Sequence, residues 1–312
     1  MSEIRFDGQV AIVTGAGGGV GRCHALELAR RGAKVVVNDL GGALDGSGGN
    51  SEAAEKVVEE IKALGGEAIA NGSSVADDAG VEKMIADTMS AFGRIDIIIA
   101  NAGVLRDKSF SKMTIEDFEF VMDVHLMGTV KPVKAAWEIM KEQNYGRIVV
   151  TTSSTGLYGN FGQTNYGAAK LGLVGFMGSL KQEGAKYNIR VNAVCPIAAT
   201  RMTEGLMTEQ ALEALKPEYV TPGVMNLVKE DAPTGMILSA AAGAYSMAQI
   251  VETKGAFVGL GDDLTAEAVA AKWDEITDTS VQKHFDMGAG HGANIFERVN
   301  EALGIDGPTI TR

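Results

Sequence analysis

The stretch Val10-Ala11-Ile12-Val13-Thr14-Gly15-Ala16-Gly17-Gly18-Gly19-Val20-Gly21 determines which fold this chain can adopt. Its apolar first half predicts a buried strand, and the amphipathic stretch from Arg22 to Arg31 predicts a helix directly after the glycines. Glycines allow a backbone to approach a pyrophosphate closely, and the start of a helix offers unpaired amides and a positive dipole end. The strand, turn and helix therefore predict a dinucleotide site rather than a flexible glycine-rich hinge.

A carboxylate follows the second predicted strand. Residues Lys34 to Asn38 form that strand, and Asp39 ends it, 24 residues after Gly15. A carboxylate at this place can accept both hydroxyls of an adenosine ribose, and it would repel a 2′-phosphate. The first basic candidate nearby, Arg22, suits a solvent-facing position in the first helical turn. We therefore expect NAD rather than NADP as the cofactor.

Three residues further along the chain suggest redox chemistry. Tyr166 and Lys170 are four positions apart, so on a helix their side chains share one face. An ammonium close to a phenol favours the phenolate, and we expect Lys170 to lower the pKa of Tyr166 toward neutrality. Ser153 follows an apolar run and can hydrogen-bond the same substrate oxygen. An isolated Tyr and Lys at this spacing usually lie on a solvated helix face. Beside a dinucleotide site, however, the spacing predicts Tyr166 as a catalytic acid or base.

The rest of the chain alternates between predicted strands and helices. Near-continuous apolar runs such as Ile97-Ile98-Ile99 are typical of strands covered on both faces, and hence of a parallel sheet. We expect an α/β fold with a doubly wound parallel sheet in a domain of residues 1–251. The predicted strands are Val10–Thr14, Lys34–Asn38, Glu67–Ala70, Ile95–Ala100, Arg147–Thr152, Arg190–Val194 and, with the weakest pattern, Gly255–Val258.

Residues 252–312 differ in composition from the domain before them. They contain 11 acidic and 5 basic residues, which is half of the whole-chain net charge of −12, yet they also contain Trp273, Phe285 and Leu303. The stretch from Thr265 to Trp273 predicts a capped amphipathic helix. We expect a folded, helical C-terminal extension, which in the simplest interpretation packs on its own subunit.

Three motifs together resemble the short-chain dehydrogenase/reductase family over roughly residues 5 to 250. They are Thr14-Gly15-x-x-x-Gly19-x-Gly21, Asn101-Ala102-Gly103, and the set Ser153, Tyr166 and Lys170. The resemblance implies a Rossmann-like fold and catalysis by this last set. It implies cofactor contacts from Gly15, Gly19, Val20, Gly21, Asp39, Ser74, Val75, Asn101, Ala102, Gly103, Tyr166, Lys170, Pro196 and Thr200.

Three shorter stretches resemble one branch of that family, the dehydrogenase part of peroxisomal multifunctional enzymes. They are Val37–Gly42, Gly156–Gln163 and Ala214–Val220. This branch implies NAD-dependent oxidation of (3R)-hydroxyacyl-CoA thioesters and of 17β-hydroxysteroids. It also implies a homodimer, or a homotetramer, in which residues 252–312 pack at the dimer interface or over an active site. Because the branch is fused to a hydratase and this chain ends at Arg312, we expect a stand-alone version.

Two positions depart from the family pattern. His125 stands where the family usually has an Asn whose carbonyl holds a water of the proton relay. Its carbonyl can serve equally, its imidazole can join the relay, or it can be a packed, neutral core histidine. Ile197 replaces the usual Gly after Cys195-Pro196, which leaves Thr200, and then Thr203, as the expected contact to the nicotinamide amide.

The substrate side is less determined. Arg106, Lys108, Arg201 and Lys216 can contact coenzyme A phosphates or be solvated surface residues, and residues 202–215 read as a mobile flap. Met202, Leu206, Met207 and Leu212 can line an acyl or steroid slot or pack against the sheet, and Asn160 and Phe161 are further candidates for a substrate contact. Three functions stay open: an NAD-dependent secondary-alcohol dehydrogenase acting on (3R)-hydroxyacyl-CoA, a carbonyl oxidoreductase with an uncharged substrate such as a hydroxysteroid, and a nucleotide sensor without turnover. The complete Ser, Tyr and Lys set argues against the sensor.

Composition narrows the classes of partner and compartment. The net charge of −12 opposes nonspecific binding to nucleic acid, whereas screening beyond about 8 to 10 Å leaves coenzyme A admissible. Apolar runs stay far short of 18 residues and Met1 to Phe6 is not leader-like, so we expect a cytoplasmic protein without a membrane span. Cys23 and Cys195 are too few for a disulfide framework, and His284 and His291 lack partners at ligand spacing, so we expect no metal.

Overall fold

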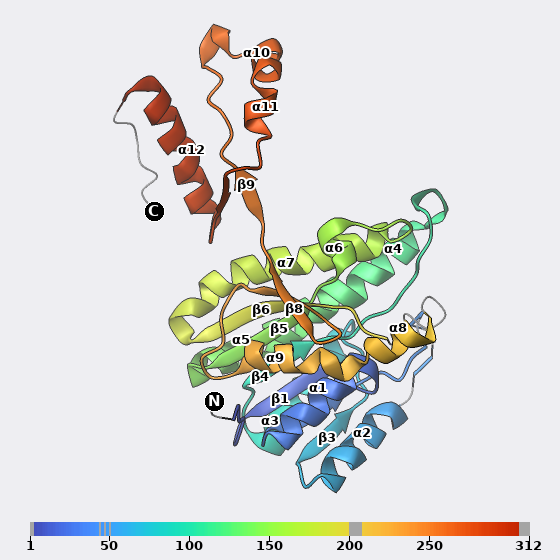
Figure 1. Cartoon of the computed structure of the whole chain (residues 1–312). Coiled ribbons are helices and arrows are strands. Elements are labelled where there is room, and N and C mark those ends of the chain that lie inside the picture. Colours follow the sequence, from blue (N-terminus) through green and yellow to red (C-terminus); the bar gives the residue numbers. More distant parts are fainter. Residues whose placement is uncertain (1–2, 44, 47, 50, 200–207, 306–312) are drawn as a thin grey trace. The chain divides into compact units, whose positions relative to one another are not determined.

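The computed structural model describes residues 3–43, 45–46, 48–49, 51–199 and 208–305. The chain forms two compact units, residues 1–247 and 248–312. The first is built on an eight-stranded sheet in the order β3-β2-β1-β4-β5-β6-β7-β8, parallel from β3 through β7 (Figure 1). The strands are β1 (Val10–Thr14), β2 (Lys34–Asn38), β3 (Ala68–Asn71), β4 (Ile97–Ala100), β5 (Gly146–Thr151), β6 (Ile189–Pro196), β7 (Ile237–Ala241) and β8 (Ala244–Ala248).

Helices cover both faces of this sheet. One face packs against α1, α2 and α9, whose apolar side chains join those of the strands in a single buried cluster. The other face packs against α3, α5 and α7. The helices of this unit are α1 (Gly19–Arg30), α2 (Glu52–Ala63), α3 (Asp78–Phe92), α4 (Ile115–Met122), α5 (Gly128–Gln143), α6 (Ser154–Tyr158), α7 (Thr164–Gly184), α8 (Glu209–Ala214) and α9 (Thr221–Val228), with a π-helical turn η2 (Asp123–Met127) between α4 and α5.

The predicted doubly wound fold is confirmed, and six of the predicted strands appear within three residues of their expected bounds. The seventh prediction, Gly255–Val258, is wrong: this segment is not a strand, and Gly255 has a φ of +64°. The seventh parallel strand is β7, whose Ser239, Ala240 and Ala241 dilute the apolar signal that marks a buried strand. An antiparallel β8 follows through the tight turn Ala242-Gly243, where both φ values are positive.

The strand order places a switch point between β1 and β4. The chain proceeds outward from β1 to β2 and β3, and then returns to place β4 on the other side of β1. The connections leaving the carboxyl ends of β1 and β4 therefore diverge, and a crevice opens where they part. The glycine turn after β1 and the Asn101-Ala102-Gly103 turn after β4 both lie at this crevice.

The second unit is small and helical, with one short two-stranded sheet. β9 (Val251–Thr253) pairs antiparallel with β10 (Gln282–His284), and the helices are α10 (Ala266–Ala271), α11 (Trp273–Ile276) and α12 (Gly288–Leu303). The Thr265 hydroxyl caps α10 by accepting from the Ala268 amide, which confirms the predicted cap. None of the described residues of α10, α11 or α12 is buried.

Candidate active site

Close backbone contacts in the glycine turn leave no room for a side chain at Gly15 and at Gly21. A Cβ on Gly15, which has a φ of +63°, would lie 2.7 Å from the Ala102 Cα. A Cβ on Gly21 would lie 2.3 Å from the Gly15 carbonyl oxygen. Helix α1 begins at Gly19 without a side-chain cap, and Gly18, Gly19 and Val20 at its start line the cavity. This is the cradle that a pyrophosphate requires.

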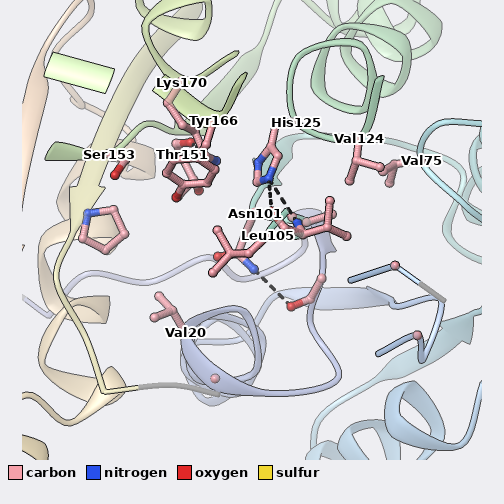
Figure 2. A pocket seen from close by; sticks show the side chains of 18 of the residues that line it. Val20, Val75, Asn101, Leu105, Val124, His125, Thr151, Ser153, Tyr166 and Lys170 are labelled. Atoms are coloured by element: carbon pink, nitrogen blue, oxygen red, sulfur yellow. Dashed lines mark hydrogen bonds between the residues drawn. The ribbon is translucent and has the colours of Figure 1, made fainter. Parts of the chain in front are cut away.

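Asn101 ties the second turn to the first. Its side-chain amide donates to the carbonyls of Thr14 and Gly15 at 3.1 and 3.0 Å. The Thr14 hydroxyl in turn accepts from the backbone amides of Asn101 and Ala102 at 3.0 and 3.1 Å. The carboxyl ends of β1 and β4 are thereby fixed to one another, and Figure 2 shows Asn101 among the side chains that line the pocket.

Asp39 is held in the orientation that a ribose contact needs. One carboxylate oxygen accepts from the Gly17 amide at 2.8 Å and the other accepts from the Gly41 amide at 2.7 Å. Each oxygen keeps a free lone pair, so two ribose hydroxyls can still be bound. Arg22 forms an ion pair with Glu60, so this basic side chain is engaged elsewhere. The residues present thus fit an adenosine ribose better than a 2′-phosphate.

A cavity of about 600 Å³ joins this nucleotide end to the predicted catalytic residues. Most of the predicted site residues line it. Gly21 packs against the Gly15 carbonyl and, like Arg106 and Phe161, lies outside the lining. Thr200, Thr203, Met202, Leu206 and Met207 fall outside the described residues. The predicted residues that line the cavity are Gly15, Gly19, Val20, Asp39, Ser74, Val75, Asn101, Ala102, Gly103, His125, Ser153, Asn160, Tyr166, Lys170 and Pro196.

Ser153, Tyr166 and Lys170 meet at the other end of the cavity (Figure 2). Ser153 caps the short helix α6, accepting from the Thr155 amide at 3.2 Å, and its side chain also hydrogen-bonds Tyr166. Tyr166 and Lys170 lie one turn apart on α7. The Lys170 ammonium donates to the Thr151 carbonyl at 2.6 Å and lies 5.6 Å from the centre of the Tyr166 ring.

The expected downward shift of the Tyr166 pKa is wrong. Burial raises the pKa of Tyr166 above its usual value of 10.0, opposed by the Ser153 hydrogen bond and assisted by the negative charge of Asp107. Burial also lowers the pKa of Lys170 to about 7, so this amine is only partly charged near neutral pH. Sequence spacing placed the two groups together but did not report burial, which disfavours both charged forms.

His125 is buried, with 2% of its surface exposed, on the π-helical turn η2. Its Nε2 lies 2.8 Å from the Val104 carbonyl oxygen, and its ring meets the Tyr166 ring edge-on at 5.0 Å between centres. Burial and the nearby Lys170 hold the pKa of His125 well below 6.5, so the imidazole is neutral. Gly103 makes room for it, because a Cβ there would lie 2.4 Å from the His125 Cε1.

Of the four basic residues proposed for phosphate contact, Arg201 lies outside the described residues and the other three already have partners. Arg106 and Lys108 both bind Asp117, at 3.3 and 2.7 Å, and Lys216 pairs with Glu213. The Arg106 guanidinium also stacks over the Phe120 ring at 3.8 Å. Phe161 is 89% exposed.

Sequence reasoning missed a polar group in the cavity lining formed by Asp107, Thr155 and Gln163. The Gln163 amide donates to Asp107 at 2.7 Å and accepts from the Thr155 hydroxyl at 2.8 Å. Gln163 ends the stretch Gly156–Gln163 quoted above, but no motif connects it to Asp107, because a single Asp in a loop has the sequence signature of a solvated surface residue.

Two further observations concern ligands and membranes. Among the residues that the structure describes, no group of three or more His, Cys, Asp or Glu side chains could hold a metal ion. The helices in the described ranges include none that is both long and apolar enough to cross a bilayer.

A glycine turn at a sheet switch point, joined by one cavity to a Ser, Tyr and Lys set, is the arrangement of an oxidoreductase with an α/β fold. Residues 9–211 match the short chain dehydrogenase family, and the chain belongs to that family.

Relatives of this chain fall into long and short proteins. The peroxisomal hydratase-dehydrogenase-epimerase of Saccharomyces cerevisiae is 49% identical over 278 residues, covering 88% of this chain and 31% of the relative. A putative short-chain type dehydrogenase/reductase of Mycobacterium tuberculosis is 49% identical over 276 residues, covering 88% of this chain and 96% of the relative. The chain thus spans less than two thirds of the multifunctional relatives that it matches.

Solved structures similar to this chain also include a long multifunctional protein and a short dehydrogenase. The full-length peroxisomal multifunctional enzyme type 2 of Drosophila melanogaster matches with a TM-score of 0.80 and 39% identity, covering 96% of this chain and 51% of that one. A 7α-hydroxysteroid dehydrogenase complexed with NADH and 7-oxo glycochenodeoxycholic acid matches with a TM-score of 0.69 and 27% identity, covering 77% and 95% of the two chains.

Proposed function

We propose that this chain is an NAD-dependent dehydrogenase that oxidises (3R)-hydroxyacyl-CoA thioesters to 3-ketoacyl-CoA. The observation that carries the proposal is the single cavity that joins Asp39 and the glycine turn to Ser153, Tyr166 and Lys170. The first two suit the adenosine and pyrophosphate of NAD, and the last three suit an alcohol under oxidation.

NAD, when bound along the glycine turn, supplies the acceptor for the hydride that leaves the carbinol carbon. In the oxidation the phenolate form of Tyr166 takes the hydroxyl proton of the substrate at its phenolic oxygen, and in the reverse reaction the phenol donates it. Ser153 donates a hydrogen bond to the substrate oxygen and steadies its developing charge. Because burial raises the Tyr166 pKa, the phenol is protonated at neutral pH, so rising pH favours oxidation and falling pH favours reduction.

The dehydrogenase activity is supported by the name of the yeast relative, a hydratase-dehydrogenase-epimerase. The thioester as substrate is supported by the three stretches that resemble the multifunctional branch. A second candidate is a hydroxysteroid or another uncharged secondary alcohol. It is supported by the 7α-hydroxysteroid dehydrogenase, which shares the fold at 27% identity.

NADH formation across a panel of alcohols tests the proposal. The purified chain is given NAD with (3R)- and (3S)-hydroxyacyl-CoA of several lengths and with 7α- and 17β-hydroxysteroids. We expect the highest kcat/KM with a (3R)-hydroxyacyl-CoA. A higher kcat/KM with any steroid would transfer the assignment to the second candidate, and no NADH with any alcohol would refute the dehydrogenase itself.

The remaining predictions about this chain stay proposals. They are a homodimer or homotetramer, an extension of residues 252–312 that packs at its interface or over an active site, a nicotinamide contact from Thr200, substrate contacts from Arg106, Asn160, Phe161, Met202 and Met207, and a role for His125 in the relay. A cytoplasmic location also stays a prediction, while the names of the multifunctional relatives call those proteins peroxisomal.

A further inference from the structure

Asp107 is fixed at the catalytic end of the cavity by two joined loops. The loop after β4 is tied to the segment between α6 and α7 by a bond from the Lys108 amide to the Gly162 carbonyl at 2.9 Å. The Asn165 side-chain amide donates to the Arg106 carbonyl at 3.3 Å. Between these ties the Gln163 amide donates to the Asp107 carboxylate at 2.7 Å. The carboxylate therefore has a set position.

Gln163 is itself held, which fixes which of its atoms faces Asp107. Its carbonyl oxygen accepts from the Thr155 hydroxyl at 2.8 Å and from the Asn160 amide at 3.0 Å. With the oxygen committed to two donors, the nitrogen must point at the carboxylate. A neutral amide does not cancel the charge of Asp107, and among the described residues no cation pairs with it.

The nearest cations along the chain are turned elsewhere. Arg106 and Lys108 flank Asp107, but both bind Asp117, and none of these three lines the cavity. Arg106, Lys108 and Asp117 together carry one net positive charge, and Asp107 carries one negative charge. Which of these two charges acts more strongly on a bound substrate therefore depends on its distance from the substrate. Coulomb energy falls with distance and exposed charges are screened beyond about 8 to 10 Å, so the lining carboxylate dominates.

The charge of Asp107 acts on the catalytic residue Tyr166. The negative charge of Asp107 is one of the causes that raise the pKa of Tyr166, together with burial and the Cys195 thiol, against the hydrogen bond from Ser153. In a 3-hydroxyacyl substrate the carbonyl carbon at position 1 is two bonds from the carbon that Tyr166 serves. A free carboxylate at position 1 would thus lie within the field of Asp107, whereas a thioester carries no charge there.

We propose that Asp107, oriented by Gln163, is a specificity residue that rejects free 3-hydroxy acids and admits their neutral thioesters. The inference rests on the proposed dehydrogenase function and adds to it a charge rule for the group beside the carbinol. It predicts a penalty that depends on ionic strength, because the carboxylate is exposed to solvent.

The test compares two substrates that share one acyl chain. Free (3R)-hydroxybutyrate and its N-acetylcysteamine thioester differ in charge at position 1, and neither carries the remote phosphates of coenzyme A. The ratio of kcat/KM for the acid to that for the thioester is measured in the unaltered protein, in Asp107→Asn and in Glu116→Gln. Glu116 is an exposed acid on α4 outside the cavity lining, so it controls for net charge.

We expect Asp107→Asn to raise this ratio by about 3- to 10-fold, the size of one screened charge at close range. Glu116→Gln should leave the ratio within twofold, and added salt should raise it in the unaltered protein more than in Asp107→Asn. An unchanged ratio in Asp107→Asn, with the thioester still oxidised, overturns the inference alone. If the unaltered protein oxidises no 3-hydroxyacyl thioester of any length in the panel above, the proposed function fails, and the inference fails with it.

Discussion

At the nucleotide end of the cavity the essential contacts are made by backbone, whereas at the catalytic end they are made by buried side chains. Gly15 and Gly21 matter because any Cβ would collide with neighbouring main chain. Tyr166 and Lys170 matter because burial changes their proton affinities in opposite directions. The nucleotide end depends on close backbone packing, and the catalytic end depends on the burial of titratable groups. Substitutions at the first end should therefore weaken NAD binding, whereas substitutions at the second should lower kcat or change its dependence on pH.

The largest difference between the ends should come from Tyr166→Phe. The change removes the titratable oxygen but keeps the ring that packs against His125. We expect kcat to fall by at least about 10²-fold while NAD binding persists, because proton transfer to a positioned group is worth that much. Steady-state rates and NADH fluorescence titration measure the two quantities.

Tyr158→Phe is the matched control, since Tyr158 is 76% exposed and lies outside the cavity lining. It should leave kcat unchanged. Turnover retained in Tyr166→Phe would remove this residue from the catalytic set and with it the proposed acid and base.

Gly21→Ala tests the nucleotide end. The new methyl group would lie 2.3 Å from the Gly15 carbonyl oxygen, so the turn must shift. Overpacking of this kind costs about 1 to 3 kcal/mol, which corresponds to roughly a 5- to 150-fold weaker NAD affinity. NAD affinity is read by fluorescence titration and the fold by circular dichroism.

Gly18→Ala provides the comparison, because a Cβ at Gly18 would meet nothing within 4 Å and its φ of −168° is open to any residue. It should keep NAD affinity within a few-fold. Equal losses in the two variants would show that glycine flexibility, and not the close approach at Gly21, governs the turn.

Cofactor choice should depend on Asp39. Asp39→Ala with Leu40→Arg removes the repulsion of a 2′-phosphate, frees the Gly17 and Gly41 amides, and adds a guanidinium. We expect the ratio of kcat/KM for NADP to that for NAD to rise by about tenfold or more. A preference of the unaltered protein for NADP would place Asp39 away from the ribose.

The same contrast explains what the sequence could predict. Gly15, Gly21 and Asp39 stand in a strand, turn and helix pattern whose geometry follows from the chain itself, and the fold and the cradle were predicted from them. The direction of the Tyr166 pKa was not, because it depends on how deeply α7 is buried. The bond between Asp107 and Gln163 joins loops 56 positions apart, so no local pattern encodes it.

The fold shows the same division between local and distant information. Runs such as Ile97 to Ile99 are apolar enough to identify a buried strand unaided. β7 contains small residues and is recognised only by its pairing with β6, while the apolar run after Gly255 does not pair. The sequence pattern thus predicts a buried strand when its apolar side chains are large, as in Ile97 to Ile99, and misses one that contains small residues, such as β7.

The smallest expected effect concerns stability at the catalytic end. Lys170 has a folded-state pKa of about 7, whereas an unfolded lysine titrates near about 10.4. Between these values the unfolded chain binds more protons than the folded one, so the free energy of unfolding contributed by this group rises with pH across that window. Below pH 7 the folded protein instead bears the cost of a buried ammonium.

Lys170→Met removes this titration while filling a similar volume. The variant should therefore gain stability relative to the unaltered protein at pH 6, and the gain should shrink or reverse at pH 9, where the native amine is neutral and still donates to the Thr151 carbonyl. Urea unfolding at the two pH values measures the difference, with Lys62→Met on the exposed face of α2 as the control. A gain that does not depend on pH would mean that the pKa of Lys170 is not lowered by folding, and the electrostatic contrast between the two ends of the cavity would then be lost. A gain shared by Lys62→Met would instead be a general effect of replacing a lysine by methionine.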